Sequence, residues 1–161
     1  MTKAQTAIAI CLIAFNVHPV WAWSAKVTYI SDGDTLWVKP EEGGRPVKIR
    51  VDGIDAPEIC QAGGQAARAA LAGRVAGRTV AVSTRRHDDY GRTVAAIDLD
   101  GEDIAGWMVG QGHAWSYSFG RDGGPYLALQ FKAQSARRGL FADPTALPPR
   151  EFRKRHGSCH P

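Results

Sequence analysis

Apolar residues recur mostly at every second position between residues 26 and 98, and this period of two constrains the fold more than any other feature of the chain. Such alternation is typical of β-strands that bury one face. It predicts five short strands, centred on Val27 and Tyr29, on Leu36 and Val38, on Val47, Ile49 and Val51, on Val80 and Val82, and on Val94 and Ala96. Two glutamates and two glycines at 41–44 favour a hairpin turn between the second and third strands.

Three helices are predicted between and after these strands. They are the alanine-rich segment 65–76 before Gly77, a helix from the capping residue Asp103 to Gly112, and a helix from Pro125 to Gly139. A chain of 161 residues has room for one domain with a substantial core. A strand-rich first half with helices inserted and appended indicates a small closed barrel of the α+β class, mainly β.

The first 22 residues have the features of a secretory signal. Lys3 precedes an apolar run at 7–17, and residues 20–22 are of the kind that a signal peptidase reads. The run is too short for a transmembrane helix, which needs ~20 residues. We therefore expect a secreted or periplasmic monomer, without stable membrane association after cleavage of residues 1–22; an uncleaved anchor is the alternative. Because the segment carries one basic residue and no acidic residue, its removal lowers the formal net charge from +4 to +3. A net charge of this size does not by itself indicate nucleic acid as a partner.

The C-terminal segment 144–161 is basic and contains several prolines, and we expect it to be mobile and without regular structure. Signal cleavage removes Cys11 and leaves Cys60 and Cys159. In an oxidising compartment these two thiols can pair, which would tie the C-terminal segment beside Glu58. Two free thiols are the alternative, because a sequence does not supply the geometry that a disulfide requires.

Candidate chemistry is concentrated in three short polar runs, Ser31 to Thr35, Arg50 to Glu58 and Asp88 to Arg92. Asp34 precedes the second predicted strand and Asp55 follows the third, and these two ends are adjacent in an antiparallel hairpin, so both carboxylates can face one point. Two carboxylates with a backbone carbonyl and water suit a hard divalent cation. The runs hold no histidine, and Cys60 is the only nearby thiol, which argues against zinc or copper.

Arg50 and Arg92 can grip a phosphate from two sides, and Glu58 is left to act on water. The apolar residues of the third strand share one face, so Arg50 should be displayed on the other face rather than buried. Taken singly, each run is also typical of an ordinary turn or helix entry. Their order, spacing and charge type together predict the cleavage of a phosphodiester bond.

From residue 26 to about residue 141 the chain resembles the staphylococcal nuclease (thermonuclease-like) family in the order of its elements and in three motifs. These motifs are Asp32-Gly33-Asp34-Thr35, Arg50 followed by Gly53-Ile54-Asp55-Ala56-Pro57-Glu58, and Asp88 through Arg92. The resemblance implies a five-stranded oligonucleotide-binding (OB) barrel with three helices at residues 23–143. It also implies Ca²⁺ as the cofactor. The implied roles are metal binding by Asp34, Asp55 and the backbone carbonyl of Ala56, phosphate clamping by Arg50 and Arg92, and general base catalysis by Glu58.

One motif position departs from the family archetype, and one substrate contact has an ambiguous register. Ala56 stands where the archetype has threonine, which leaves the main-chain oxygen available. A tyrosine that contacts substrate in the archetype falls within 115–119, and we assign it to Tyr117, with Tyr90 as the second substrate-binding candidate. Trp115 and Phe119 can instead pack on the barrel.

The expected activity is hydrolysis of DNA and RNA with little sequence specificity and a preference for single strands. The resemblance implies products that end in 3′-phosphates and 5′-hydroxyls. The alternative is a non-catalytic nucleic-acid-binding or protein-interaction module on the same barrel. A secreted, Ca²⁺-stabilised adhesion or structural domain is a third possibility, but it leaves Arg50 and Arg92 unexplained.

Overall fold

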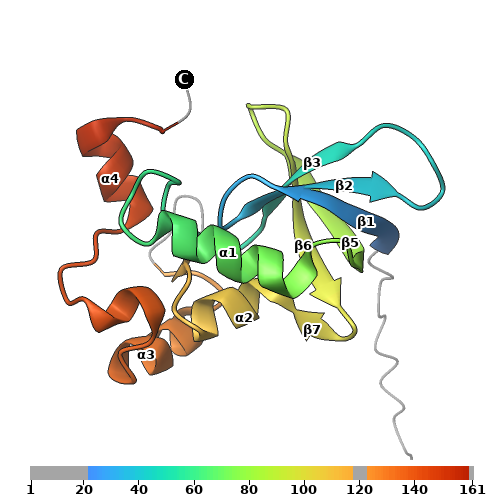
Figure 1. The fold of residues 1–161 in the computed structure, drawn as a ribbon. Helices are drawn as coiled ribbons and strands as arrows, with labels where there is room; N and C mark the ends of the chain where they lie inside the picture. The colour runs from blue at the N-terminus through green and yellow to red at the C-terminus, as the bar shows by residue number, and fades with distance from the viewer. Residues whose placement is uncertain (1–21, 118–122, 160–161) are drawn as a thin grey trace, which may run out of the picture.

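Five strands close into a barrel because the last of them pairs with two others (Figure 1). The computed structural model describes residues 22–117 and 123–159. The barrel strands are β1 (Ala22–Ile30), β2 (Thr35–Pro40), β3 (Val47–Val51), β5 (Thr79–His87) and β6 (Thr93–Leu99). β1 lies between β2 and β5, β3 pairs with β2, and β6 pairs antiparallel with β5 and parallel with β3. This closed arrangement confirms the predicted five-stranded α+β barrel.

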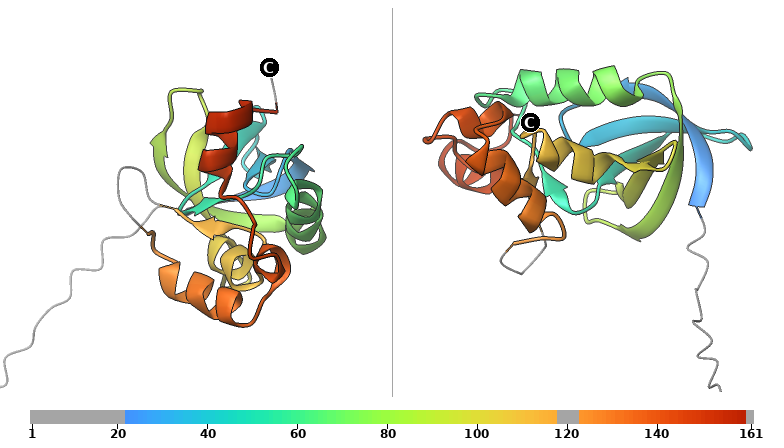
Figure 2. Two further views of the ribbon diagram at one scale, coloured as in Figure 1. Left: turned by 90° about the vertical axis from the view of Figure 1, so that its left-hand side faces the viewer. Right: turned by 90° about the horizontal axis from the view of Figure 1, so that it is seen from below.

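The remaining elements are short strands and helices packed around the barrel (Figures 1 and 2). β4 (Ile54–Asp55) pairs with β8 (Trp115–Ser116), and β7 (Glu102–Asp103) extends the sheet beyond β6. The helices are α1 (Gly64–Val75), α2 (Ile104–Gly110), α3 (Leu127–Ser135), a 3₁₀ turn (Gly139–Ala142) and α4 (Pro149–His156). The three predicted helices are confirmed, and Asp103 caps α2 by accepting a hydrogen bond from the amide of Ala105 at 3.1 Å.

The core fills the barrel and continues beneath α1 and α2. α1 contributes Ala67, Leu71 and Val75, which are spaced by four residues and therefore lie on one face of the helix. The barrel interior is lined by the buried residues Val27, Leu36, Val38, Ile49, Val51, Val80, Val82, Ala95 and Ile97. The predicted inward positions of β2, β3 and β5 are thus confirmed.

Three residues predicted to point inward, Tyr29, Val94 and Ala96, lie outside the core cluster. A register shift between Val27 and Tyr29 turns the ring of Tyr29 outward, where it is 54% exposed. In β6 the residues that join the core are Ala95, Ile97 and Leu99 rather than Val94 and Ala96. Val94 is also buried, because β6 is covered on both faces near its start, and a strand buried on both faces does not show a clean alternation.

The prediction that the C-terminal segment lacks regular structure is wrong, since the described residues form four α-helices rather than three. Pro148 and Pro149 do not end regular structure; they begin α4, since proline is tolerated in the first helical turn. Glu151 in the first turn and the basic residues of the last turn match the helix dipole. A disulfide joins Cys60 to Cys159 across 99 residues and fixes the end of this helix to the loop before α1.

The N-terminal signal prediction lies almost entirely outside the described residues, since only Ala22 of that segment is included, as the first residue of β1. In the two described ranges, no helix combines the length and the apolar character needed to cross a membrane.

We predict opposite effects on stability for alanine at two glycines. A Cβ at Gly33 would lie 2.7 Å from the Cβ atoms of both Ala56 and Ala67, so the loop before β2, the loop after β4 and α1 would have to separate. Gly33→Ala should lower the free energy of unfolding by about 1–3 kcal/mol. Gly73→Ala, on the exposed face of α1 with no described neighbour within 4 Å outside the helix backbone, should raise it by about 0.5–1 kcal/mol. Urea unfolding measures both, and equal effects would contradict the close packing at Gly33.

Candidate active site

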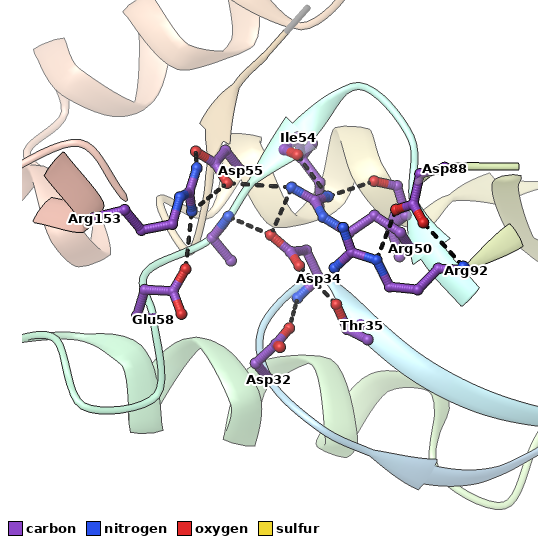
Figure 3. A network of polar contacts seen from close by, with 12 residues as sticks. Asp32, Asp34, Thr35, Arg50, Ile54, Asp55, Glu58, Asp88, Arg92 and Arg153 are labelled. Carbon is purple, nitrogen blue, oxygen red and sulfur yellow. Dashed lines mark hydrogen bonds and ion pairs between the residues drawn. The ribbon is translucent and has the colours of Figure 1, made fainter. Parts of the chain in front are cut away.

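The start of β2 and the end of β3 bring Asp34 and Asp55 together. Thr35 is paired with Arg50, and the amide of Val51 donates to the carbonyl oxygen of Asp34 at 2.8 Å. Asp34 Oδ2 and Asp55 Oδ1 each lie 3.1 Å from Nη2 of Arg50 (Figure 3). Both aspartates are buried, with 6% and 3% of their surface exposed. The predicted convergence of the two carboxylates at one hairpin end is therefore observed.

The prediction that Arg50 is displayed on the surface is wrong, because the turn after β3 folds over its side chain. Its Nη1 donates to the carbonyl oxygens of Val51 and Ile54, both at 2.8 Å, and only 15% of the side chain is exposed. Gly53 makes this return possible, since its φ of 78° is a conformation that other residues rarely adopt. The guanidinium group thus joins two carbonyls to two carboxylates, and this network fixes its orientation.

Arg92 comes from the turn before β6, where Val94 is the direct partner of Arg50 in the parallel ladder. Asp88 holds this turn and the side chain together. Its Oδ2 accepts from Nε of Arg92 at 2.7 Å, and its Oδ1 accepts from the amides of Tyr90 and Arg92 at 3.1 and 2.9 Å. Burial disfavours ionisation of Asp88, but these hydrogen bonds and the charge of Arg92 outweigh it and lower its pKa. Asp88 therefore presents Arg92 in a fixed direction.

Ala56 and Glu58 follow Asp55 on the same loop. The amide of Ala56 donates to Asp34 Oδ2 at 2.7 Å, so this residue ties the two aspartate-bearing segments together through its backbone. Glu58 is 14% exposed at its side chain, and its amide and carbonyl oxygen both bond to Gln61, which closes the loop. The carboxylate of Glu58 lies 2.9 Å from a guanidinium nitrogen of Arg153.

The two predicted substrate-binding tyrosines have different settings. Tyr90 is 85% exposed, and the guanidinium carbon of Arg92 lies 5.3 Å from the centre of its ring. Tyr117 is half-buried, and its amide donates to the carbonyl oxygen of Gly53 at 2.9 Å, beside the β4–β8 pairing. Trp115 packs edge-on against Phe141 of the 3₁₀ turn, with ring centres 5.5 Å apart. Phe119, the other residue of the packing alternative, lies outside the described residues.

Sequence reasoning left three residues of this site without a role. Asp32 accepts a hydrogen bond from the amide of Asp34 at 3.0 Å, and the hydroxyl of Thr35 donates to Asp34 Oδ1 at 3.0 Å. Burial, followed by the negative charge of Asp34, raises the pKa of Asp32 to about 7. Both residues belong to the first polar run, which could have indicated them. Arg153 belongs to the segment that was expected to be mobile, and no local pattern indicated it.

The charges of the site suit a divalent cation. Among the described residues of this network, four carboxyl groups face two guanidinium groups, and the six residues are Asp32, Asp34, Asp55, Glu58, Arg50 and Arg153. Burial and the charge of Asp34 raise the pKa of Asp55 although both arginines oppose this shift. The available ligands are oxygen atoms, since the thiol of Cys60 is consumed in a disulfide.

Within the described ranges, no group of three or more histidine, cysteine or acidic side chains is arranged to hold a metal. A cation at this site would therefore rely on the pair Asp34 and Asp55, completed by a backbone carbonyl and water. That donor set fits Ca²⁺, which accepts six to eight oxygen ligands in flexible geometry.

Comparison with known proteins agrees with this geometry. The family model described as staphylococcal nuclease homologue matches residues 48–143. The chain is 39% identical over 166 residues to a protein named ParB from Escherichia coli, covering 96% of this chain and 91% of that protein. It is 33% identical over 165 residues to a micrococcal nuclease from Shigella flexneri, covering 94% and 92% of the two chains. An uncharacterised endonuclease from Haemophilus influenzae is 36% identical over 131 residues, or 81% of this chain and 73% of its own. This chain therefore belongs to the family of staphylococcal nuclease homologues.

Proposed function

We propose that this protein is a Ca²⁺-dependent nuclease that hydrolyses phosphodiester bonds of DNA and RNA. The observation that carries the proposal is the convergence of two buried aspartates on Arg50, with Glu58 on the loop that follows. Similarity to a micrococcal nuclease and to an endonuclease supports the same chemistry. Ca²⁺ would be held by Asp34, Asp55 and the carbonyl of Ala56, and when bound it supplies polarisation of a phosphate.

The chain's own residues supply the remaining chemistry. Glu58 accepts a proton from a water molecule whose oxygen forms a bond to phosphorus. The bond from phosphorus to the 5′ oxygen breaks, and this oxygen takes up a proton from a solvent water, while Glu58 returns its own proton to solvent. The products are a 3′-phosphate and a 5′-hydroxyl. Arg50 and Arg92 donate to the non-bridging oxygens as negative charge accumulates there, and their fixed orientation reduces the reorganisation needed.

Sequence specificity should be weak. The groups assigned to the substrate recognise phosphate, and phosphate contacts position a nucleic acid without reading its bases. Tyr90 and Tyr117 are the candidates for contacts beyond the phosphate, and the exposed ring of Tyr90 offers a stacking surface that accepts any base. Stacking of this kind needs unpaired bases, so single strands should be preferred.

The proposed location is the periplasm or the cell exterior. The Cys60–Cys159 disulfide fits an oxidising compartment, and residues 1–22 are proposed to be removed on export. The mature chain is proposed to act as a monomer without stable membrane association.

The first prediction from this function concerns the cation. Mature protein should degrade heat-denatured DNA when Ca²⁺ is added and stop when a chelator removes it, with the products followed on a gel. Degradation that continues unchanged in excess chelator would contradict the role of the metal. Binding of DNA without degradation, measured by fluorescence anisotropy, would favour the non-catalytic module instead.

A second prediction tests Glu58 as the base. Glu58→Gln keeps the size of the side chain and removes its basicity, so turnover should fall by roughly 10²- to 10⁴-fold while single-stranded DNA binds nearly as before. Glu42→Gln, in the exposed turn after β2, is the matched control and should be neutral. Wild-type turnover in Glu58→Gln would remove the assignment.

A third prediction concerns the anchor of Arg92. Asp88→Ala should lower turnover at least several-fold, but by less than the roughly 10²- to 10³-fold expected from losing a phosphate donor outright. The control is Asp89→Ala, which removes the neighbouring exposed carboxylate. Steady-state kinetics on a fluorogenic oligonucleotide compares the two, and equal rates would show that Arg92 does not need Asp88.

A further inference from the structure

A third arginine reaches the site from the C-terminal helix. Nη2 of Arg153 lies 2.9 Å from Asp55 Oδ2, and its Nη1 donates to Asp55 Oδ1 at 3.2 Å and to Glu58 Oε1 at 2.9 Å (Figure 3). One planar group thus spans the proposed metal ligand and the proposed base. Arg50 contacts the same Asp55 Oδ1, so Asp55 lies between two arginines.

Helix α4 is attached to the loop of Glu58 by links on both sides of Arg153 in the chain. Before the helix, Nε2 of Gln61 donates to the carbonyl oxygen of Leu147 at 2.6 Å. After it, Cys159 is bonded to Cys60, and the amide of Cys60 donates to the sulfur of Cys159 at 3.2 Å. In the ribbon views α4 lies beside the loop that leads into α1 (Figures 1 and 2). The loop and the helix therefore form one cross-linked unit.

The carboxylate of Glu58 is bound to this unit through Arg153. It lies on a loop between β4 and α1, and within the described ranges its carboxylate has one ion-pair partner, Arg153. A group that removes a proton from water has to be held within hydrogen-bond reach of that water, and small displacements cost rate steeply. Helix α4 has only eight residues, too few to be stable by itself, so its position depends on its links to the rest of the chain.

We propose that Arg153 is a positioning residue of the nuclease site, which aligns Glu58 with Asp55, and that the Cys60–Cys159 disulfide keeps it there. The inference rests on the proposed nuclease function and adds to it a dependence of turnover on the disulfide. The bridge then supports catalysis through one side chain as well as stabilising the fold.

The test begins with kinetics on a single-stranded fluorogenic oligonucleotide with Ca²⁺. Arg153→Ala should lower kcat roughly 10- to 100-fold, the loss typical of removing a group that orients a ligand or base, with little change in KM. Arg153→Lys should recover part of this loss, and so should guanidinium added to Arg153→Ala at concentrations far below those that unfold the protein. Arg155→Ala removes the same charge from an exposed position of the same helix and should be neutral.

A double-mutant cycle then tests the disulfide. The pair Cys60→Ser and Cys159→Ser should lower kcat when Arg153 is present and cause little further loss in Arg153→Ala, because both changes remove the same interaction. Independent, additive losses would overturn the link between the disulfide and Arg153.

Two further outcomes separate this inference from the proposed function. Turnover of Arg153→Ala equal to or faster than wild type, with tighter Ca²⁺ binding by calorimetry, would show that Arg153 competes with the cation for Asp55 and would overturn the positioning role. Wild-type protein that binds Ca²⁺ but does not cleave the oligonucleotide would overturn the proposed function itself.

Discussion

The rest of the site depends on the ion pairs that two buried aspartates, Asp34 and Asp55, make with the guanidinium group of Arg50. A carboxylate removed from water costs several kcal/mol unless charges and hydrogen bonds compensate it. Arg50 supplies one charge to both Asp34 and Asp55, and the amide of Ala56 supplies a further hydrogen bond to Asp34. The compensation is incomplete, because the pKa of Asp55 stays raised by burial and by the charge of Asp34. With Asp32 and Glu58 included, four carboxyl groups of the described site face the two guanidinium groups of Arg50 and Arg153, and this excess is the physical reason for expecting a divalent cation here.

Barrel closure assembles the site from segments that are distant in the chain. The parallel pairing of β3 with β6 sets Arg50 opposite Val94, and the turn that carries Arg92 immediately precedes β6. A slip of one residue in this ladder would send each side chain of the strand to the opposite face. The register of the closing strands therefore decides whether the two proposed phosphate-binding arginines act together.

The C-terminal segment adds a second layer to this arrangement. The family model ends at residue 143, whereas Arg153 and Cys159 lie beyond it. A helix that would be marginal in isolation is linked by a disulfide and a side-chain hydrogen bond to the loop of Glu58. Structural stabilisation and the orientation of a proposed catalytic group thus depend on the same contact.

Local sequence patterns were sufficient to predict the barrel strands, three helices and the proximity of Asp34 to Asp55. The reason is that hydrophobic periodicity, helix capping and the adjacency of hairpin ends are short-range properties. Only the tertiary structure decided the burial of Arg50, since it depends on the turn at Gly53 folding back over the side chain. The sequence pattern did not reveal which face of β6 points into the core, because that strand is buried on both faces near its start. Arg153 and Glu58 are 95 residues apart in the sequence, and neither periodicity nor a motif predicts a contact between residues so far apart. It exists because the disulfide and the packing of α4 return the end of the chain to the active-site loop.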